Sequence, residues 1–233
     1  MPGLFITFEG GEGSGKTTQL KALLAALRGS GTEAIETRDP GGTAVGKQIR
    51  ELLLDREQTR METTAELFLY EASRAQLVAE VIRPALARGR VVLCDRFCDS
   101  TVAYQGYGRG LDQGLIAQLN AVATGGLAPG LTFLLDLDPT LGLARARQRG
   151  LQHCQQQDRM ERELLAFHQR VRDGYRAIAA AEPARVVVVD GARGMTEIEG
   201  EIRRRVEAVL ASAGRTGRRG RLPGDAPPPS VAD

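Results

Sequence analysis

The sequence predicts an α/β protein with a five-stranded parallel sheet that has helices on both faces. Two observations support this. Short, continuous runs of β-favouring apolar residues recur along the chain, and stretches with leucines at helical spacing lie between them. A continuous apolar run, rather than an alternating one, is typical of a strand buried on both faces. With 233 residues, the chain is long enough for one sizeable domain and too short for two ordinary ones.

The expected elements alternate along the chain. The predicted strands are residues 4–8, 34–37, 91–94, 131–137 and 185–189. The predicted helices include residues 16–28, 45–54 and 63 to about 87, and Pro84 is expected to kink or break the last of them. Glu9, Asp95 and Asp190 stand at the carboxyl ends of three strands. Because ligands of open α/β sheets bind at that edge, we expect the functional site there.

The C-terminal segment has a different composition. From Ala211 onward, glycine, arginine and a triple proline replace any apolar periodicity. Such a segment cannot bury enough apolar surface to order itself, so we expect a domain at 1–210 and a disordered tail at 211–233. A tail that touches nucleic acid is the alternative, although four arginines in a short flexible stretch are more often solvated.

Charge and composition limit the partners. The net charge of +2 is that of the tail, so no basic domain face is implied and we expect no nucleic-acid partner. No run approaches the roughly 20 apolar residues of a membrane-spanning helix, and we expect no membrane association. The three cysteines are irregularly spaced, as reduced thiols are, and the chain enters its first strand without a secretory leader. We therefore expect a cytoplasmic protein.

A phosphate-binding loop lies between the first strand and the first helix. Residues 10–17 read GGEGSGKT, which satisfies G-x-x-x-x-G-K-[ST] in the context that the motif requires. Small residues let backbone N–H groups turn inward around a phosphate at the positive end of a helix. A glycine-rich turn with a chance lysine is the alternative. The residues expected to bind ATP are Gly10, Gly11, Glu12, Gly13, Ser14, Gly15, Lys16, Thr17 and Thr18.

Within this loop, Lys16 is expected to reach the outer phosphates and the Thr17 hydroxyl to ligate Mg2+. GTPases, motors and small-molecule kinases share the loop, so the loop alone does not identify the reaction. Residues 39–42 satisfy the D-x-x-G of a GTPase switch, but no N-K-x-D for guanine occurs. The chain instead has many arginines near expected loops, which suits a kinase that brings two anions together.

Five segments together resemble the thymidylate kinase family, over residues 4 to about 210. They are FEGGEGSGKTT (8–18), RDPGGT (38–43), ASR (72–74), DRFCDSTVAYQG (95–106) and DRME (158–161). The resemblance implies a three-layer P-loop NTPase fold with a small lid at about 145–160 and a homodimer formed through helices beside the sheet. It also implies that ATP with Mg2+ phosphorylates dTMP to dTDP.

Several residues take roles from this resemblance. Asp95 ends a buried strand beside the loop, where a carboxylate can hold Mg2+ or orient the acceptor phosphate. The family implies that Arg96 clamps the acceptor phosphate and that Arg50 is a second clamp. Solvation is the alternative for Arg50, and a helix cap or structural ion pair is the alternative for Asp95.

Other residues match positions that bind the nucleoside of the acceptor. The resemblance implies that Tyr70 stacks on the pyrimidine and that Arg74, one turn later, donates to a base carbonyl. The family often has phenylalanine where Tyr70 stands, and simple packing on the sheet is the alternative. The remaining matches are Thr101 and Gln105 for the thymine edge, Tyr104 and Glu12 for the sugar, and Asp39 in the substrate site. Because Glu12 would repel the phosphates that its loop binds, we expect it to face the 3′-hydroxyl of the acceptor.

A lid is expected where Arg145, Arg147 and Arg149 alternate before a polar stretch that ends at Arg159. Cations of a lid neutralise charge on the transferred group and exclude water. One branch of the family has a catalytic arginine where this chain has Gly13, so the chain resembles the other, bacterial branch, in which the lid supplies it. We expect Arg149 and Arg159 to act with Lys16, Asp95 and Arg96. Surface arginines along a helix are the alternative.

Two further alternatives stay open at this stage. The acceptor could be another nucleoside monophosphate or a deoxynucleoside. A P-loop switch without an acceptor is the non-kinase alternative.

Overall fold

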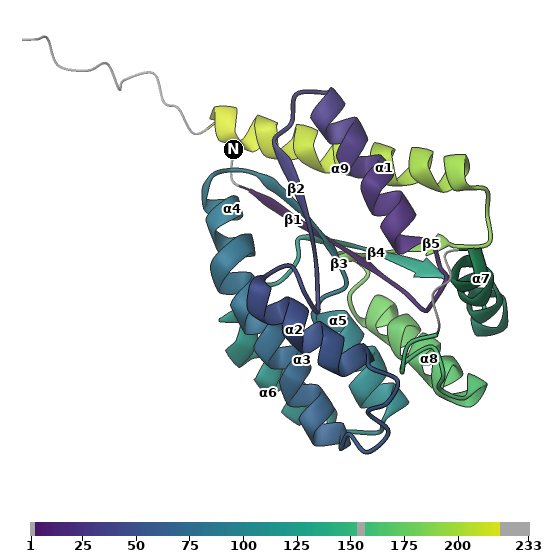
Figure 1. Ribbon diagram of the computed structural model, residues 1–233. Coiled ribbons are helices and arrows are strands. Elements are labelled where there is room, and N and C mark those ends of the chain that lie inside the picture. Colours follow the sequence, from purple (N-terminus) through teal and green to yellow (C-terminus); the bar gives the residue numbers. More distant parts are fainter. Residues whose placement is uncertain (1–2, 153–156, 220–233) are drawn as a thin grey trace, which may run out of the picture.

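A computed structural model describes residues 3–152 and 157–219, with side chains as far as residue 212. Five parallel strands form one sheet in the order β2-β3-β1-β4-β5 (Figure 1). The strands are β1 (Leu4–Glu9), β2 (Ala34–Arg38), β3 (Val91–Asp95), β4 (Leu131–Asp136) and β5 (Val186–Asp190). The α/β fold class is thus confirmed, and each strand lies where the apolar runs predict it.

Helices connect the strands and cover both faces of the sheet. α1 and α9 lie together on one face, and α2, α3, α6 and α8 lie on the opposite side (Figure 1). No helix among the described residues is long and apolar enough to cross a membrane. The helical segments are α1 (Lys16–Gly29), α2 (Ala44–Leu54), α3 (Thr63–Leu77), η1 (Val78–Ile82), α4 (Arg83–Ala87), α5 (Cys98–Thr101), η2 (Val102–Gly108), α6 (Gln113–Thr124), α7 (Pro139–Gln152), α8 (Leu165–Ala181) and α9 (Met195–Arg219).

The cores on the two faces fix the carboxyl edge of the sheet. On one face, the leucines of α1 pack on Ile6 and Phe8 of β1 and on Ile198 of α9. On the other face, Phe167 and Val171 of α8 pack with η2 against β4 and β5. Burial of these side chains on both sides explains why the strands are continuously apolar. The sheet therefore presents Glu9, Asp95 and Asp190 at one rigid edge.

The long helix expected at 63–87 contains an irregular segment. It is α-helical to Leu77, π-helical in η1 and α-helical again in α4. The wider π turn ends shortly before Pro84, whose ring would clash with the carbonyl four residues earlier in a regular helix. The kink predicted from Pro84 is thus realised as a π-helical turn.

α9 continues to Arg219, beyond the domain boundary expected at residue 210. Loss of apolar periodicity did not end the helix, since alanine and arginine are good helix formers and the first proline comes only at Pro223. The disorder expected further on, at residues 220–233, lies outside the described residues.

Candidate active site

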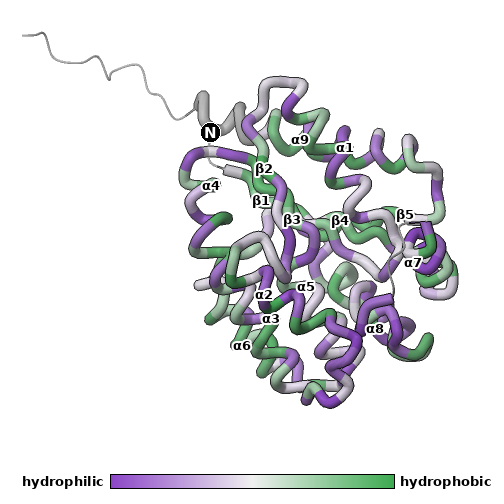
Figure 2. The backbone as a smooth tube through the Cα atoms, viewed as in Figure 1, coloured by the Kyte–Doolittle hydropathy of each residue, from purple (hydrophilic) through white to green (hydrophobic). Residues whose placement is uncertain are grey.

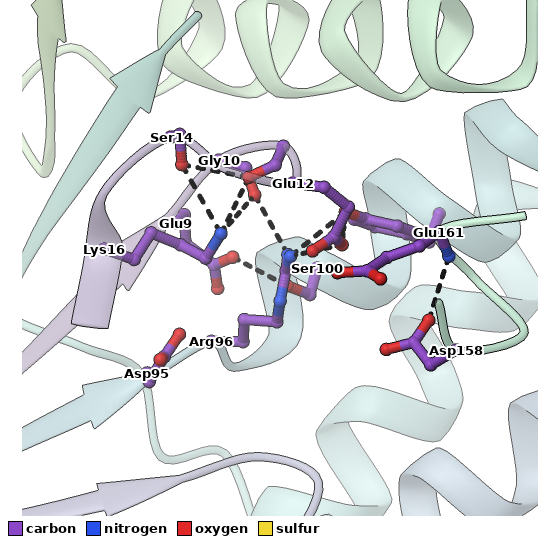
Figure 3. Close-up of polar contacts among 12 residues, drawn as sticks. Glu9, Gly10, Glu12, Ser14, Lys16, Asp95, Arg96, Ser100, Asp158 and Glu161 are labelled. Atoms are coloured by element: carbon purple, nitrogen blue, oxygen red, sulfur yellow. Dashed lines mark hydrogen bonds and ion pairs between the residues drawn. The ribbon is translucent and has the colours of Figure 1, made fainter. Parts of the chain in front are cut away.

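The phosphate loop follows β1 and ends in the first turn of α1. Gly10, Gly13 and Gly15 all have positive φ, which lets the backbone turn back on itself. Lys16 is buried and its Nζ donates to the carbonyl oxygens of Gly10 (3.1 Å) and Gly11 (2.8 Å), as Figure 3 shows. The ammonium group is therefore held inside the loop at the positive end of α1. Ser14 Oγ donates to the Gly11 carbonyl (2.9 Å) and braces the same turn.

Gly13 has no room for a side chain. At its φ of +65°, a Cβ atom would overlap the backbone of Gly142 in α7, and a Cβ on Gly142 would overlap the carbonyl oxygen of Glu12. The loop and α7 therefore touch backbone to backbone. This contact explains why an arginine side chain cannot stand at position 13.

Two side chains with hard oxygen atoms, Thr17 and Asp95, lie at the mouth of the loop. Parallel pairing places Asp95 beside Phe8, at the end of neighbouring strands. Thr17 is exposed, as is Thr18, and the Thr17 hydroxyl donates to Asp95 Oδ2 at 2.7 Å. Mg2+ prefers a few protein oxygens and otherwise water and phosphate, so this pair fits the ion. In the described part of the chain, no cluster of three or more His, Cys, Asp or Glu residues forms a different metal site.

Arg96 lies between the phosphate loop and a neighbouring cavity. Its backbone has a φ of +71°, a region that non-glycine residues rarely adopt. Its guanidinium donates to the Gly10 carbonyl (3.0 Å), to Glu12 Oε1 (2.8 Å) and to the Tyr104 hydroxyl (3.1 Å). Figure 3 shows the side chain pointing at the loop from the end of β3.

Glu12 turns away from the inside of the loop. Its Oε1 accepts hydrogen bonds from Arg96 and from the Tyr104 hydroxyl, both at 2.8 Å. Burial alone would raise the pKa of Glu12, but Arg96, Lys16 and the Tyr104 hydroxyl together lower it to about 2. The Glu12 side chain therefore points away from the inside of the loop, toward Arg96 and Tyr104.

A cavity of about 70 Å3 opens next to this pair. It contains all nine side chains expected to bind the acceptor and adds residues that were not expected. The full set is Glu12, Asp39, Pro40, Arg50, Leu54, Tyr70, Arg74, Arg96, Ser100, Thr101, Tyr104, Gln105, Asp158 and Met160. Asp158 and Met160 belong to the DRME segment, which therefore lies at the cavity as well as beside the expected lid.

Arg74 is the buried centre of the cavity wall, with an exposed fraction of 1%. It donates to Asp39 Oδ2, to Thr101 Oγ1 and to Asn120 Oδ1, each at 2.6 Å. It also pairs with Glu71 at 2.8 Å. Burial raises the pKa of Asp39 and of Glu71 in spite of the nearby Arg74. The positive charge of the Arg74 guanidinium thus offsets part of the desolvation cost of the Asp39 and Glu71 carboxylates, and the same side chain lines the cavity.

Two of these partners were not predicted. Glu71 lies three residues before Arg74 on α3, so helical spacing could have identified it. Asn120 belongs to α6, and no sequence signal connects it with α3. Asp39 and Thr101 therefore have a structural role in addition to the binding roles expected for them, because both accept hydrogen bonds that hold the Arg74 side chain in place.

Gln105 is fixed by an unexpected residue, Glu66. The Gln105 amide nitrogen donates to Glu66 Oε1 at 2.7 Å. Glu66 is buried and also pairs with Arg109 (3.1 Å) and Arg159 (2.6 Å). Because the amide nitrogen is occupied by a carboxylate, the orientation of the Gln105 amide is determined.

Arg50 and Tyr70 form the side of the cavity nearest α2 and α3. Both are half-buried, and Arg50 Nη1 donates to the Pro40 carbonyl at 3.2 Å. Burial and the neighbouring Arg38 lower the pKa of Arg50. Burial also raises the pKa of Tyr70, so its ring is a neutral surface that can stack on a base.

The expected lid arginines have different surroundings. Arg149 is 56% exposed and pairs with Glu161 at 3.5 Å. Arg159 instead donates to the Leu53 carbonyl (2.8 Å) and pairs with Glu66. Arg145 donates to the Gly191 carbonyl in the loop after β5 (2.9 Å). Residues 153–156 of the expected lid lie outside the described residues. In this structure, Arg159 is thus bound to Glu66 beside the cavity, whereas Arg149 is accessible.

Comparison with known proteins gives one consistent family. The sequence model described as thymidylate kinase matches residues 8–202. The thymidylate kinase of Solidesulfovibrio magneticus is 58% identical over 81% of this chain and 91% of that protein. That of Deinococcus radiodurans is 56% identical over 86% of this chain and 94% of its own length. A crystal structure of thymidylate kinase from Ehrlichia chaffeensis has a TM-score of 0.69 and 34% identity, covering 88% of this chain and 99% of that one.

Proposed function

The chain belongs to the thymidylate kinase family and phosphorylates dTMP to dTDP, and we propose that ATP with Mg2+ is the donor and that the residues act as follows. The observation that carries the proposal is the position of Arg96. Its guanidinium contacts both the phosphate loop and the cavity wall. A cation at this point can hold the two anions close enough for in-line transfer.

The phosphate loop binds the donor. Its backbone N–H groups and the start of α1 favour phosphate, and Lys16 exchanges its carbonyl partners for the outer phosphates. Thr17 and Asp95 would hold Mg2+, which supplies charge neutralisation for the donor phosphates when bound. The chain's own part is to fix these oxygens at the end of β3 and the start of α1, 2.7 Å apart.

The cavity binds dTMP. Tyr70 stacks on the pyrimidine, and Thr101 and Gln105 read the edge of the base. Arg74 donates to a base carbonyl in exchange for one of its present acceptors, of which the Phe97 carbonyl is the most distant at 3.4 Å. Glu12 and Tyr104 face the sugar, while Arg96 and Arg50 bind the acceptor phosphate. A base with a different hydrogen-bonding edge would leave a buried group such as the Gln105 carbonyl oxygen without a partner, and would therefore bind less tightly.

The lid completes the donor site. We assign the region at about 145–160 to the lid and Arg149 to the transferred phosphate, because its side chain is exposed and loosely paired. Arg159 acts there only after it leaves Glu66, so its contribution requires movement of the segment that contains it.

An assay of ADP release with a panel of nucleoside monophosphates tests the proposal. We expect saturation with dTMP and not with the other acceptors, and a large loss of turnover in Lys16→Met with the fold retained. Turnover of another monophosphate in place of dTMP would contradict the base-site assignment. Nucleotide hydrolysis without any acceptor would favour a P-loop switch.

We also assign a homodimer to the face formed by α2, α3 and α6. These helices are neighbours and expose Val45, Leu52, Phe68, Leu115 and Val122. Val122 is 81% exposed, and apolar stretches run along α3 and α6 in Figure 2. Exposed apolar side chains on adjacent helices are typical of an interface. Light scattering on Phe68→Glu should give a monomer, with Leu164→Glu, on another exposed position, as the control.

The location is assigned to the cytoplasm, because dTMP and ATP must both be present and Cys94 and Cys98 are free thiols. Cell fractionation with an antibody against the chain tests this assignment. Recovery in the membrane or secreted fraction would contradict it.

A further inference from the structure

Glu9 is a buried carboxylate beneath the phosphate loop that the mechanism above does not use. It ends β1 and is 1% exposed. Its Oε1 accepts a hydrogen bond from the backbone N–H of Phe97 (2.7 Å). Its Oε2 accepts from the hydroxyls of Ser100 (2.7 Å) and Tyr175 (2.8 Å). All three donors are satisfied by one side chain, which Figure 3 shows between Lys16 and Ser100.

The two hydroxyls connect Glu9 to Arg96. A hydroxyl has one hydrogen, and when that hydrogen is donated to Glu9 the oxygen remains free to accept. Arg96 Nη1 lies 3.0 Å from the Tyr175 hydroxyl and 3.3 Å from the Ser100 hydroxyl. In its ionised form, the Glu9 carboxylate can only accept, and it therefore directs both hydroxyl oxygens toward the guanidinium.

The backbone contact acts on the same residue. The Phe97 N–H that Glu9 accepts belongs to the peptide that follows Arg96, and the Arg96 N–H donates to the Phe8 carbonyl at 3.0 Å. These two bonds hold the peptides on either side of the Arg96 Cα. Such restraint is required because a φ of +71° is unfavourable for arginine.

We propose that Glu9 is a positioning residue for Arg96, which fixes both the strained backbone and the direction of the guanidinium so that the clamp is ready before dTMP arrives. The inference rests on the proposed function of Arg96. It adds a reason for the geometry of the site: an Arg96 side chain that its partners already hold in the binding orientation loses less conformational entropy when dTMP binds.

The surroundings make a purely stabilising role a poor explanation. Burial and the nearby Asp99 raise the pKa of Glu9 to about 7, while Arg96, Ser100 and Tyr175 favour the charged form. Asp99 itself is held by Arg185 at 2.8 Å. Burial of a carboxylate costs free energy of desolvation, so stabilisation of the fold alone does not explain the presence of Glu9. Buried charges of this kind are often found at functional sites.

Glu9→Gln tests the inference because the substitution keeps the shape and removes one acceptor. An amide nitrogen that faces the Phe97 N–H would place a donor against a donor, so we expect it to face the two hydroxyls, whose oxygens then accept from it and whose hydrogens turn away from residue 9. The Ser100 and Tyr175 oxygens lie 2.8 Å apart, so they can then bond to each other instead of orienting Arg96. We expect the KM for dTMP to rise roughly tenfold, with the KM for ATP changed by less than about twofold.

Tyr175→Phe and Ser100→Ala provide a second route that leaves Glu9 in place, should Glu9→Gln not fold. Each is expected to raise the KM for dTMP, and their effects should not add to that of Glu9→Gln, because all act through Arg96. Tyr107→Phe, on the half-exposed Tyr107 of η2, is the matched control and should change neither KM.

Arg96→Lys separates failure of this inference from failure of the proposed function. If Arg96→Lys raises the KM for dTMP whereas the Glu9, Ser100 and Tyr175 variants do not, the positioning role is wrong and the clamp remains. Equal changes in both KM values with a lowered Tm would mean that Glu9 is only structural. If Arg96→Lys leaves dTMP binding unchanged, the clamp is wrong and the inference falls with it.

Discussion

Replacement of Glu12 by glutamine tests the electrostatics of the loop directly. In the folded protein, the pKa of Glu12 falls from 4.5 to about 2. A pKa unit corresponds to about 1.4 kcal/mol, so the shift amounts to about 3 kcal/mol as an upper value. The side chain is 19% exposed, and screening reduces the contribution. We therefore expect Glu12→Gln to lower the free energy of unfolding at pH 7 by about 2 kcal/mol, or Tm by roughly 4–8 °C.

The pH dependence gives the sharper test. Because the folded pKa lies below the unfolded one, the contribution of Glu12 is fully present above about pH 4.5 and is lost as the pH falls toward 2. Urea unfolding of the wild type and Glu12→Gln at several pH values between 7 and 3 should show a difference that narrows below pH 4.5. Glu36→Gln, on the exposed side of β2, is the control. A difference that stays constant down to pH 3 would refute the reasoning.

Three further substitutions have expected outcomes. In Gly13→Ala, the added methyl group should overlap the backbone of Gly142 and weaken ATP binding by at least about tenfold in calorimetry. Unchanged binding would show that α7 moves aside to make room for the methyl group. Arg74→Met should abolish dTMP turnover and cost about 3–5 kcal/mol in urea unfolding, since Asp39 is left without its partner; a stability loss below about 1 kcal/mol would contradict this. Thr17→Val should raise the Mg2+ concentration needed for half-maximal activity several-fold with little change in Tm, and an unaltered Mg2+ requirement would exclude Thr17 as a ligand.

The loop and the sheet could be predicted because their signals are local. The motif at residues 10–17 needs a strand before it and a helix after it, and both appear as periodic patterns in the adjacent sequence. Asp95 was predictable for a related reason, since the end of a buried strand in a parallel sheet determines where the next residue lies.

The partners across the cavity could not be predicted from spacing. Asn120 reaches Arg74 from α6, and Glu66 holds Gln105 and Arg159 from α3. These contacts depend on how helices pack over the sheet, which one sequence does not specify. For the same reason, the lid arginines could be named as a group, whereas the binding of Arg159 to Glu66 required the structure.

The contact between Gly13 and Gly142 has a mechanical consequence. Side chains usually absorb small displacements by changing rotamer, but two glycines have none, so a shift of the phosphate loop pushes directly on the main chain of α7. α7 carries Arg145, Arg147 and Arg149. If the region at about 145–160 is the lid proposed above, a displacement of the loop on nucleotide binding would thus move the main chain that carries these three arginines.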